Sequence, residues 1–283
     1  MSEMTKGDLP PYVSMSRAMA PGSGGAPDVP VLIYAPAEPG LLRPALLFVH
    51  GGGFVLGAAA DWGPACARLA VEQGCIVASV DYRLAPETPF PGPLEDCYAA
   101  LCWLHGAAEG LAVDPRRIVI CGPSAGGGLA AALALAARDR GGPPICAQFL
   151  TYPMLDHRTG TAASPYDNPT AGEFGWTAAL NQFGWRAMMG GRNDPSPSHL
   201  CSPSRAKSLA GLPPTFIAVG ALDLLVDENI EYARRLMHAG VPVELHVYPG
   251  AFHGFDFTPE AAVSKQFERD YREALARALA RPI

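Results

Sequence analysis

Ser124 lies in the motif Gly122-Pro123-Ser124-Ala125-Gly126, in which glycines flank a single hydroxyl at a spacing of two residues. A serine hydroxyl attacks a carbonyl carbon when a neighbouring base removes its proton, and it then forms a covalent acyl intermediate. Glycines at both flanks allow the chain to double back so tightly that a Cβ there would strike a neighbouring helix or strand. The motif therefore predicts a nucleophilic serine in a sharp turn.

The segments beside this motif favour the sharp turn over an ordinary loop in a glycine-rich chain. Ile118 to Ile120 is an apolar, β-branched run of the kind found in strands. Leu129 to Ala137 is alanine-rich and favours a helix. The order of strand, turn and helix predicts that Ser124 lies at the C-terminal edge of a sheet.

A second glycine-rich segment precedes the serine motif. The strand predicted over Ala45 to Val49 ends in His50-Gly51-Gly52-Gly53-Phe54. Three consecutive glycines let backbone N–H groups point toward one position, as stabilisation of a tetrahedral oxyanion requires. A flexible turn is the alternative interpretation, but it does not explain why these glycines follow a strand and precede the serine motif.

The two motifs together resemble the hormone-sensitive-lipase-like branch of the α/β hydrolases, in which an HGGG loop and a GxSAGG turn occur in one chain. Further matches are the DYRLAPE stretch over Asp81 to Glu87 and the trio Pro91, Glu95 and Asp96. The resemblance runs from about Val31 to the C-terminus. For the charged residues of these stretches we expect ion pairs that fix loops beside the sheet, in preference to a second acid/base pair.

The resemblance implies roles for individual residues. Ser124 would be the nucleophile, and the N–H groups of Gly51, Gly52 and Ala125 would form the oxyanion hole. His50 then belongs to the scaffold of the loop. Where the family usually has Asp or Thr before the nucleophile, this chain has a proline, which lacks an N–H group and has a fixed φ; no subfamily follows from that difference.

A base and an acid are expected in the order Ser, acid, His, each after a strand. His253 follows the predicted strand over Val243 to Val247, and Asp223 follows the one over Thr215 to Val219. The other histidines lack such a position: His50, His105, His157, His199, His238 and His246.

Asp227 and Glu228 are rivals for the acid. Both stand at the start of the predicted helix from Asp227 to His238, where carboxylates ordinarily cap the helix or interact with its dipole. The family stretch G-x-x-D-x-L-x-D-E, aligned from Gly220, assigns the acid to Asp223. The sequence therefore favours a Ser124, His253 and Asp223 triad.

Strands and helices alternate around these motifs, which predicts one α/β domain over residues 1–283 with right-handed crossovers. The resemblance implies the α/β-hydrolase fold: a mostly parallel, eight-stranded sheet flanked by helices, with a small cap. The other predicted elements are strands over Val31–Ala35, Cys75–Val80 and Ile145–Thr151 and helices over Asp61–Gln73, Leu94–Ala108 and Pro259–Ala280.

Two segments interrupt this alternation. Residues 1–28 are rich in Gly and Pro, so we expect an irregular arm. The segment before the HGGG loop is shorter than is usual in the family, so the resemblance implies that this arm is a reduced N-terminal cap. Residues 154–209 offer no strand candidate and predict a cap or lid over the ligand crevice. We expect an acyl pocket among Phe54, Trp185, Met188, Phe252 and Phe255, with packing in the core as the alternative for each. A thin cap suggests an open site and short acyl esters.

Composition excludes several classes of protein. The chain has 283 residues, 49% of them hydrophobic and 17% charged, which fits a compact enzyme. A net charge of −6 gives no basic surface for nucleic acid. We expect no membrane span and no signal segment, and hence a cytoplasmic protein. The seven cysteines show no CxxC spacing, so we expect buried thiols and no metal site.

The sequence thus predicts a serine carboxylesterase that hydrolyses small-molecule esters through an acyl-enzyme, without a cofactor. An amidase, deacetylase or thioesterase would use the same residues and stays open. A non-catalytic ligand-binding protein of this fold is disfavoured because Ser, His and Asp are all present. A phosphate-binding loop over Gly122 to Gly128 lacks the Lys-Ser/Thr ending and the full GxGxxG spacing. The resemblance also implies a homodimer formed through an edge strand or the cap.

Overall fold

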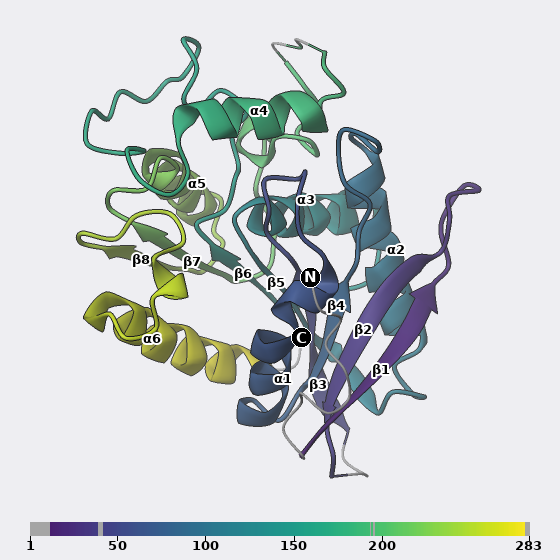
Figure 1. Cartoon of the computed structure of the whole chain (residues 1–283). Helices are drawn as coiled ribbons and strands as arrows, with labels where there is room; N and C mark the ends of the chain where they lie inside the picture. Colours follow the sequence, from purple (N-terminus) through teal and green to yellow (C-terminus); the bar gives the residue numbers. More distant parts are fainter. Residues whose placement is uncertain (1–11, 39–41, 193, 195, 281–283) are drawn as a thin grey trace.

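The computed structural model describes residues 12–38, 42–192, 194 and 196–280, which build one eight-stranded sheet (Figure 1). The strand order is β1-β2-β4-β3-β5-β6-β7-β8. The first two strands are antiparallel to their neighbours, and all pairs from β4 through β3 to β8 are parallel. The strands are β1 (Val13–Ala20), β2 (Val29–Pro36), β3 (Arg43–Val49), β4 (Ile76–Val80), β5 (Val113–Pro123), β6 (Ala147–Thr151), β7 (Thr215–Gly220) and β8 (Val243–Tyr248).

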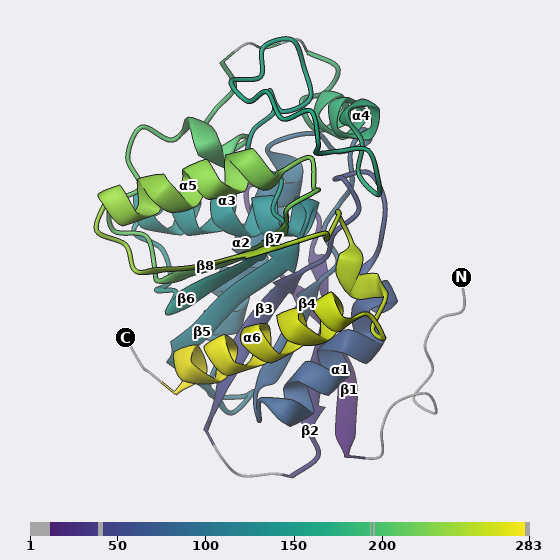
Figure 2. The ribbon, with the colours of Figure 1, turned by 90° about the vertical axis from the view of Figure 1, so that its left-hand side faces the viewer.

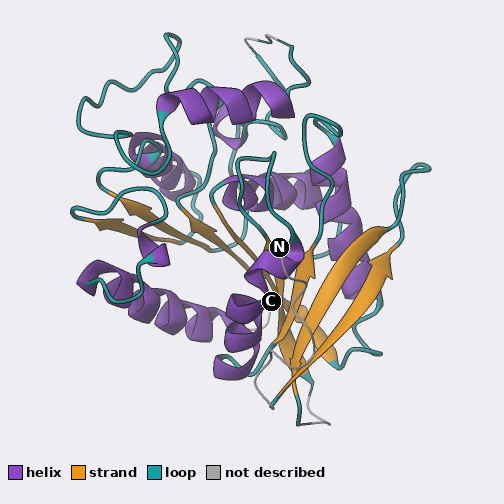
Figure 3. Ribbon diagram, in the orientation of Figure 1, coloured by secondary structure: helices purple, strands orange, loops and turns teal. Residues whose placement is uncertain are grey.

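Helices cover both faces of the sheet (Figures 2 and 3). One face carries α1 and α6, and the other carries α2, α3 and α5. The helices are α1 (Gly63–Glu72), α2 (Gly92–Gly106), α3 (Ala125–Arg140), α4 (Ala178–Met188), α5 (Val226–His238) and α6 (Ala262–Leu279). The predicted eight-stranded, mostly parallel sheet flanked by helices is confirmed.

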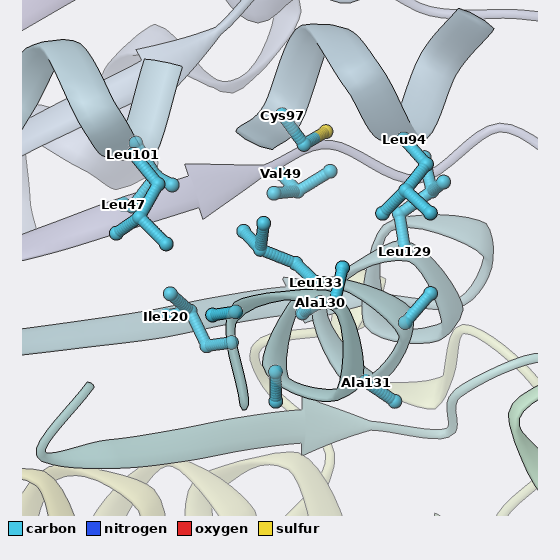
Figure 4. Close-up of a cluster of buried hydrophobic side chains, with 14 of the residues drawn as sticks. Leu47, Val49, Leu94, Cys97, Leu101, Ile120, Leu129, Ala130, Ala131 and Leu133 are labelled. Atoms are coloured by element: carbon cyan, nitrogen blue, oxygen red, sulfur yellow. The ribbon is translucent and has the colours of Figure 1, made fainter. Parts of the chain in front are cut away.

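The core on the α3 side of the sheet explains why the serine motif is followed by alanines. Every residue of α3 from Ala125 to Ala137 is buried, since this helix lies between the sheet and α2. Figure 4 shows leucines of α2 and α3 meeting apolar side chains of β3 and β5. Small side chains let α3 approach the strands closely, which fixes the position of its first residue at the sheet edge.

The N-terminal expectation is wrong for the described part of residues 1–28. Val13–Ala20 forms β1 and pairs with β2 from Val13 opposite Pro36 to Ala20 opposite Val29. The glycines that argued against an element form the hairpin turn instead: Gly24 and Gly25 have φ of 62° and 85°. Residues 1–11, also part of the predicted arm, lie outside the described residues.

The segment 154–209 connects β6 to β7 and carries α4 (Figure 1). Thr177 caps this helix by accepting the N–H of Leu180. The helix packs against the glycine loop after β3, because a Cβ added at Gly184 would lie 2.7 Å from the carbonyl oxygen of Gly53. The insertion thus lies over the ends of the parallel strands. Within the described ranges, no helix has the length and apolarity needed to cross a bilayer.

Candidate active site

Ser124 occupies a strained turn between β5 and α3. Its φ of 56° and ψ of −123° lie in a region that L-residues rarely adopt. The turn persists because its backbone is bonded on both sides: the Ser124 N–H donates to Thr151 O at 2.8 Å, and Ser124 O accepts from Gly128 N at 3.0 Å and Met154 N at 3.1 Å. A Cβ at Gly122 or Gly126 would overlap the carbonyl oxygen of Val49, as the motif predicted.

A chain of two hydrogen bonds connects the three residues that the sequence selected. His253 Nε2 lies 2.9 Å from Ser124 Oγ, and His253 Nδ1 lies 2.8 Å from Asp223 Oδ2. Asp223 is fully buried, and its other oxygen accepts the N–H of Leu225 at 2.9 Å. These residues come from three different strand ends, after β5, β7 and β8. The parallel sheet therefore brings them to one edge.

Three backbone N–H groups stand beside the serine. Ala125 is the first residue of α3, so its N–H has no partner within the helix. In the part of the chain that the structure describes, the N–H groups of Gly51 and Gly52 donate to no protein acceptor. Both glycines line the same cavity as Ser124. The arrangement leaves donors available at the place where an oxyanion would form.

Buried polar contacts hold the glycine loop, and His50 takes part in these contacts rather than in proton transfer. His50 is fully buried, and its Nδ1 lies 2.8 Å from Gly51 O. Its ring stacks on Tyr82 at 4.1 Å between centroids, and Tyr82 donates its hydroxyl to His50 O at 2.9 Å. Burial lowers the pKa of His50, which keeps the imidazole neutral.

The charged residues of the DYRLAPE stretch also make structural contacts. The Arg83 guanidinium forms a bidentate pair with the buried Asp96, with a shortest distance of 2.6 Å. Asp81 accepts the N–H of Ala59 at 2.9 Å. None of these residues lines the cavity at Ser124.

The rival acids lie elsewhere. Asp227 accepts an amide hydrogen bond from Asn168 at 2.9 Å. Glu228 is fully buried and accepts the N–H of Leu155 at 2.7 Å, so it fastens the start of the insertion to α5. Burial raises the pKa of Glu228 well above its ordinary value. Neither carboxylate contacts His253.

A cavity of about 300 Å³ opens at Ser124. Its walls are largely apolar and come from four loops: Gly51, Gly52, Gly53, Leu56, Gly57, Trp62, Pro123, Ser124, Tyr152, Trp176, His253 and Phe257. In the described ranges, no group of three His, Cys, Asp or Glu side chains is arranged to hold a metal ion.

The prediction of five side chains for an acyl pocket is wrong, because none of the five lines this cavity. Phe54 and Trp185 are buried against each other at 5.0 Å between ring centroids. Met188 is buried in the same cluster, and Phe255 packs in the core near α6. Phe252 is 38% exposed and packs against Phe174.

Aromatic residues outside these five line the cavity instead. Trp176 of the insertion lies 5.9 Å from the His253 ring, and its Nε1 donates to Asn181 Oδ1 at 3.0 Å. Tyr152, which follows β6 with a φ of 36°, lies 4.5 Å from the same ring. Tyr152 also donates its hydroxyl to Asp256 at 2.6 Å. The available signals were the position of Tyr152 directly after a strand and that of Asp256 three residues after the histidine.

Comparison with known proteins identifies the family of this chain. A family model described as alpha/beta hydrolase fold matches residues 46–257. The chain belongs to the α/β-hydrolase family.

Within that family, its relatives place it in the hormone-sensitive-lipase-like esterase branch, as the resemblance predicted. Esterase LipI of Mycobacterium tuberculosis is 41% identical over 214 residues, covering 75% of this chain and 65% of LipI. Carboxylesterase NlhH of the same species is 39% identical over 242 residues, covering 83% of this chain and 73% of NlhH.

A solved structure of the family agrees closely with this α/β hydrolase. It is that of a bacterial heroin esterase, with a TM-score of 0.90 and 45% identity. The match covers 95% of this chain and 85% of the esterase. The likeness therefore extends beyond residues 46–257 of the family model and takes in most of the chain on either side of them.

Proposed function

We propose that this protein is a carboxylic ester hydrolase that works through an acyl-enzyme on Ser124. The observation that carries the proposal is the hydrogen-bond chain from Ser124 Oγ through both nitrogens of His253 to Asp223, with distances of 2.9 and 2.8 Å. A serine, a base and an orienting carboxylate in this geometry recur in serine hydrolases of unrelated folds.

The first step is attack on the ester carbonyl. His253 carries its proton on Nδ1, where it donates to Asp223, so Nε2 is free to accept the hydroxyl proton of Ser124. As the Oγ–C bond forms, the carbonyl oxygen becomes an oxyanion. The buried Asp223 carboxylate keeps the ring in this tautomer and stabilises the imidazolium that results.

The oxyanion is held by the N–H groups of Gly51, Gly52 and Ala125. The unused donors of the glycine loop and the first N–H of α3 support this assignment. Each such donor typically contributes roughly 3–4 kcal/mol to transition-state stabilisation. Because these donors are backbone groups, they are fixed before the substrate arrives.

Collapse of the intermediate expels the alcohol, which takes the proton from His253 Nε2. Water then repeats the sequence on the acyl-enzyme, with His253 again as base, and releases the acid and free Ser124. No step needs a metal or an organic cofactor. The chemistry matches a site lined almost entirely by apolar and backbone groups.

We propose short-to-medium acyl esters as substrates and a cap role for residues 154–209. A cavity of about 300 Å³ suits a small ester. The insertion supplies Trp176 to its wall, and a Cβ at Gly53 would lie 2.5 Å from that indole. The insertion therefore supports both the pocket and the loop that holds the oxyanion.

The test is hydrolysis of p-nitrophenyl esters from acetyl to palmitoyl by the wild type and by Ser124→Ala. The proposal predicts turnover that is greatest for short chains and is lost in the variant. Amide and thioester analogues in the same assay establish the bond that is preferred. Absence of turnover by the wild type, together with failure of a serine-reactive phosphonate to label Ser124, would refute the proposal.

We also propose that the protein acts in the cytoplasm and as a homodimer. All seven cysteines are free thiols, which suits a reducing compartment. Strand β8 ends the sheet and pairs within the described chain only with β7, so its outer edge can accept another strand. Sedimentation at several concentrations tests the dimer, and a single monomeric species would refute it.

A further inference from the structure

Trp62 and Pro123 each line two cavities. One is the cavity of about 300 Å³ at Ser124, and the other is a smaller cavity of about 120 Å³ between α1 and α6. Trp62 is half-buried and precedes α1 directly. Its ring lies 5.4 Å from Phe48 and 5.8 Å from Phe257. The indole therefore forms part of a partition between the two spaces.

The smaller cavity has apolar walls and a charged outer border. Phe48, Leu69 and Phe267 contribute apolar side chains. Toward the surface, Arg272 pairs with Glu72 at 3.0 Å and with Glu268 at 2.6 Å. A hydrocarbon chain that entered this cavity would exchange contact with water for contact with these apolar side chains.

The partition and the ring neighbours of His253 form different parts of the wall of the site. The departing alcohol must lie beside His253 Nε2, whose ring neighbours are Tyr152 and Trp176. The remaining wall contains Leu56, Trp62 and the Pro123 ring. In the proposed mechanism, the acyl substituent of a bound ester would lie against this part of the wall, beside Trp62.

We propose that Trp62 sets the upper limit of acyl-chain length by closing the α1–α6 cavity to the substrate. This inference rests on the proposed esterase function and deepens it. Removing the indole adds the second cavity to the acyl pocket, so longer acyl chains fit. Each further methylene that becomes buried should raise kcat/KM about fourfold, as expected from about 0.8 kcal/mol per methylene.

The experiment measures kcat/KM for p-nitrophenyl esters of increasing acyl length in the wild type, Trp62→Ala and Trp62→Leu. The leaving group is constant in this series, so only the acyl pocket is varied. The backbone at this position is held independently of the indole, since Asp81 accepts the N–H of Ala59 in the preceding turn. The leucine variant keeps more of the packing and serves where the alanine variant does not fold.

A second substitution refills the space from the other side. Ala65 of α1 lines only the smaller of the two cavities. The double variant Trp62→Ala/Ala65→Leu should therefore return the optimum toward short chains. A parallel series of alkyl acetates, which varies only the alcohol, should show no such shift in Trp62→Ala.

The outcomes separate this inference from the esterase proposal. A longer optimum in the Trp62 variants that Ala65→Leu reverses supports the partition. An unchanged optimum in variants that still hydrolyse p-nitrophenyl acetate and are labelled at Ser124 overturns the partition and leaves the esterase intact. A shift in the alcohol series, or one that Ala65→Leu does not reverse, overturns it as well. A wild type that neither hydrolyses esters nor is labelled refutes the esterase itself.

Discussion

Two groups of Ser, His and Asp can be compared within the described residues, and only one of the two has the geometry of a proton relay. At the strand ends, Ser124 and Asp223 contact different nitrogens of His253, at 2.9 and 2.8 Å. At the base of the insertion, Ser202 Oγ lies 3.1 Å from His157 Nδ1 and Asp156 lies 3.8 Å from that same nitrogen. In a proton relay, one ring nitrogen of the histidine donates to the carboxylate and the other accepts the serine proton, so a single nitrogen cannot serve both purposes.

The surroundings of the second group also indicate a structural role. Ser202 is fully buried, accepts the N–H of His157 at 3.2 Å and donates to Leu155 O at 3.1 Å. Asp156 is committed to the Arg158 guanidinium at 2.7 Å. Neither residue lines the cavity at Ser124. The comparison teaches that residue types alone do not make a catalytic site: the second group fastens the insertion to the core.

The largest contrast is expected between Ser124→Ala and Ser202→Ala. Loss of the nucleophile should lower kcat/KM about 10⁴- to 10⁶-fold, as in other triads. Ser202→Ala should instead leave the rate per folded molecule unchanged and lower the free energy of unfolding by about 1–3 kcal/mol, because it leaves buried groups without partners. Ester hydrolysis and urea unfolding of both variants check this. A catalytic defect in Ser202→Ala, with wild-type stability, would break the comparison.

The acid of the relay gives the next largest effect. Asp223→Asn preserves shape but favours the wrong tautomer of His253, so kcat should fall about 10⁴-fold. Asp227→Asn is the matched control, because Asp227 lies in the first turn of α5 and contacts Asn168 rather than the histidine. Steady-state kinetics of the pair decide between the two acids. Equal losses in both variants would contradict the assignment to Asp223.

The smallest effect concerns the pH dependence of stability. Burial lowers the pKa of His157 from its ordinary 6.5. The unfolded chain therefore takes up a proton below about pH 6.5 that the folded protein does not, and stability falls as the pH decreases through that value. The loss can reach about 1.4 kcal/mol per pH unit.

His157→Gln should remove this part of the pH dependence. Urea unfolding of the wild type and of the variant, each near pH 7.5 and near pH 5.5, gives for each protein the change in free energy of unfolding between the two pH values. The nearby Asp156 has a pKa lowered by Arg158 despite its burial, so it stays ionised over this range. The same pH dependence in both proteins would show that His157 is not the group responsible.

The central sheet and the residues of the relay could be predicted because both depend on local patterns in the sequence. Glycines at 122 and 126 are required by the approach of Val49 O. The strand before Asp223 is marked by an apolar run, and the strand before His253 is marked by alternating apolar and polar residues. In a parallel sheet such ends share one edge, so proximity follows from topology. The structure does bring these three side chains into hydrogen-bond distance.

The first strand and the pocket walls escaped prediction for physical reasons. Strand β1 is defined by backbone pairing with β2 at the sheet edge, and its side chains lack a clear alternation of apolar and polar residues. The walls depend on which loop side chains turn inward. Trp62 and Trp176 do so and Trp185 does not, although all three are large apolar residues. Such choices are made by tertiary packing.

The most direct test of the account is labelling of the native protein with a fluorophosphonate, followed by peptide mass spectrometry. The account predicts one adduct per chain, on Ser124, that forms as ester hydrolysis disappears. Ser202 should remain unmodified, and His253→Gln should prevent the reaction because the base is missing. An adduct on Ser202, or full inactivation without modification of Ser124, would contradict it.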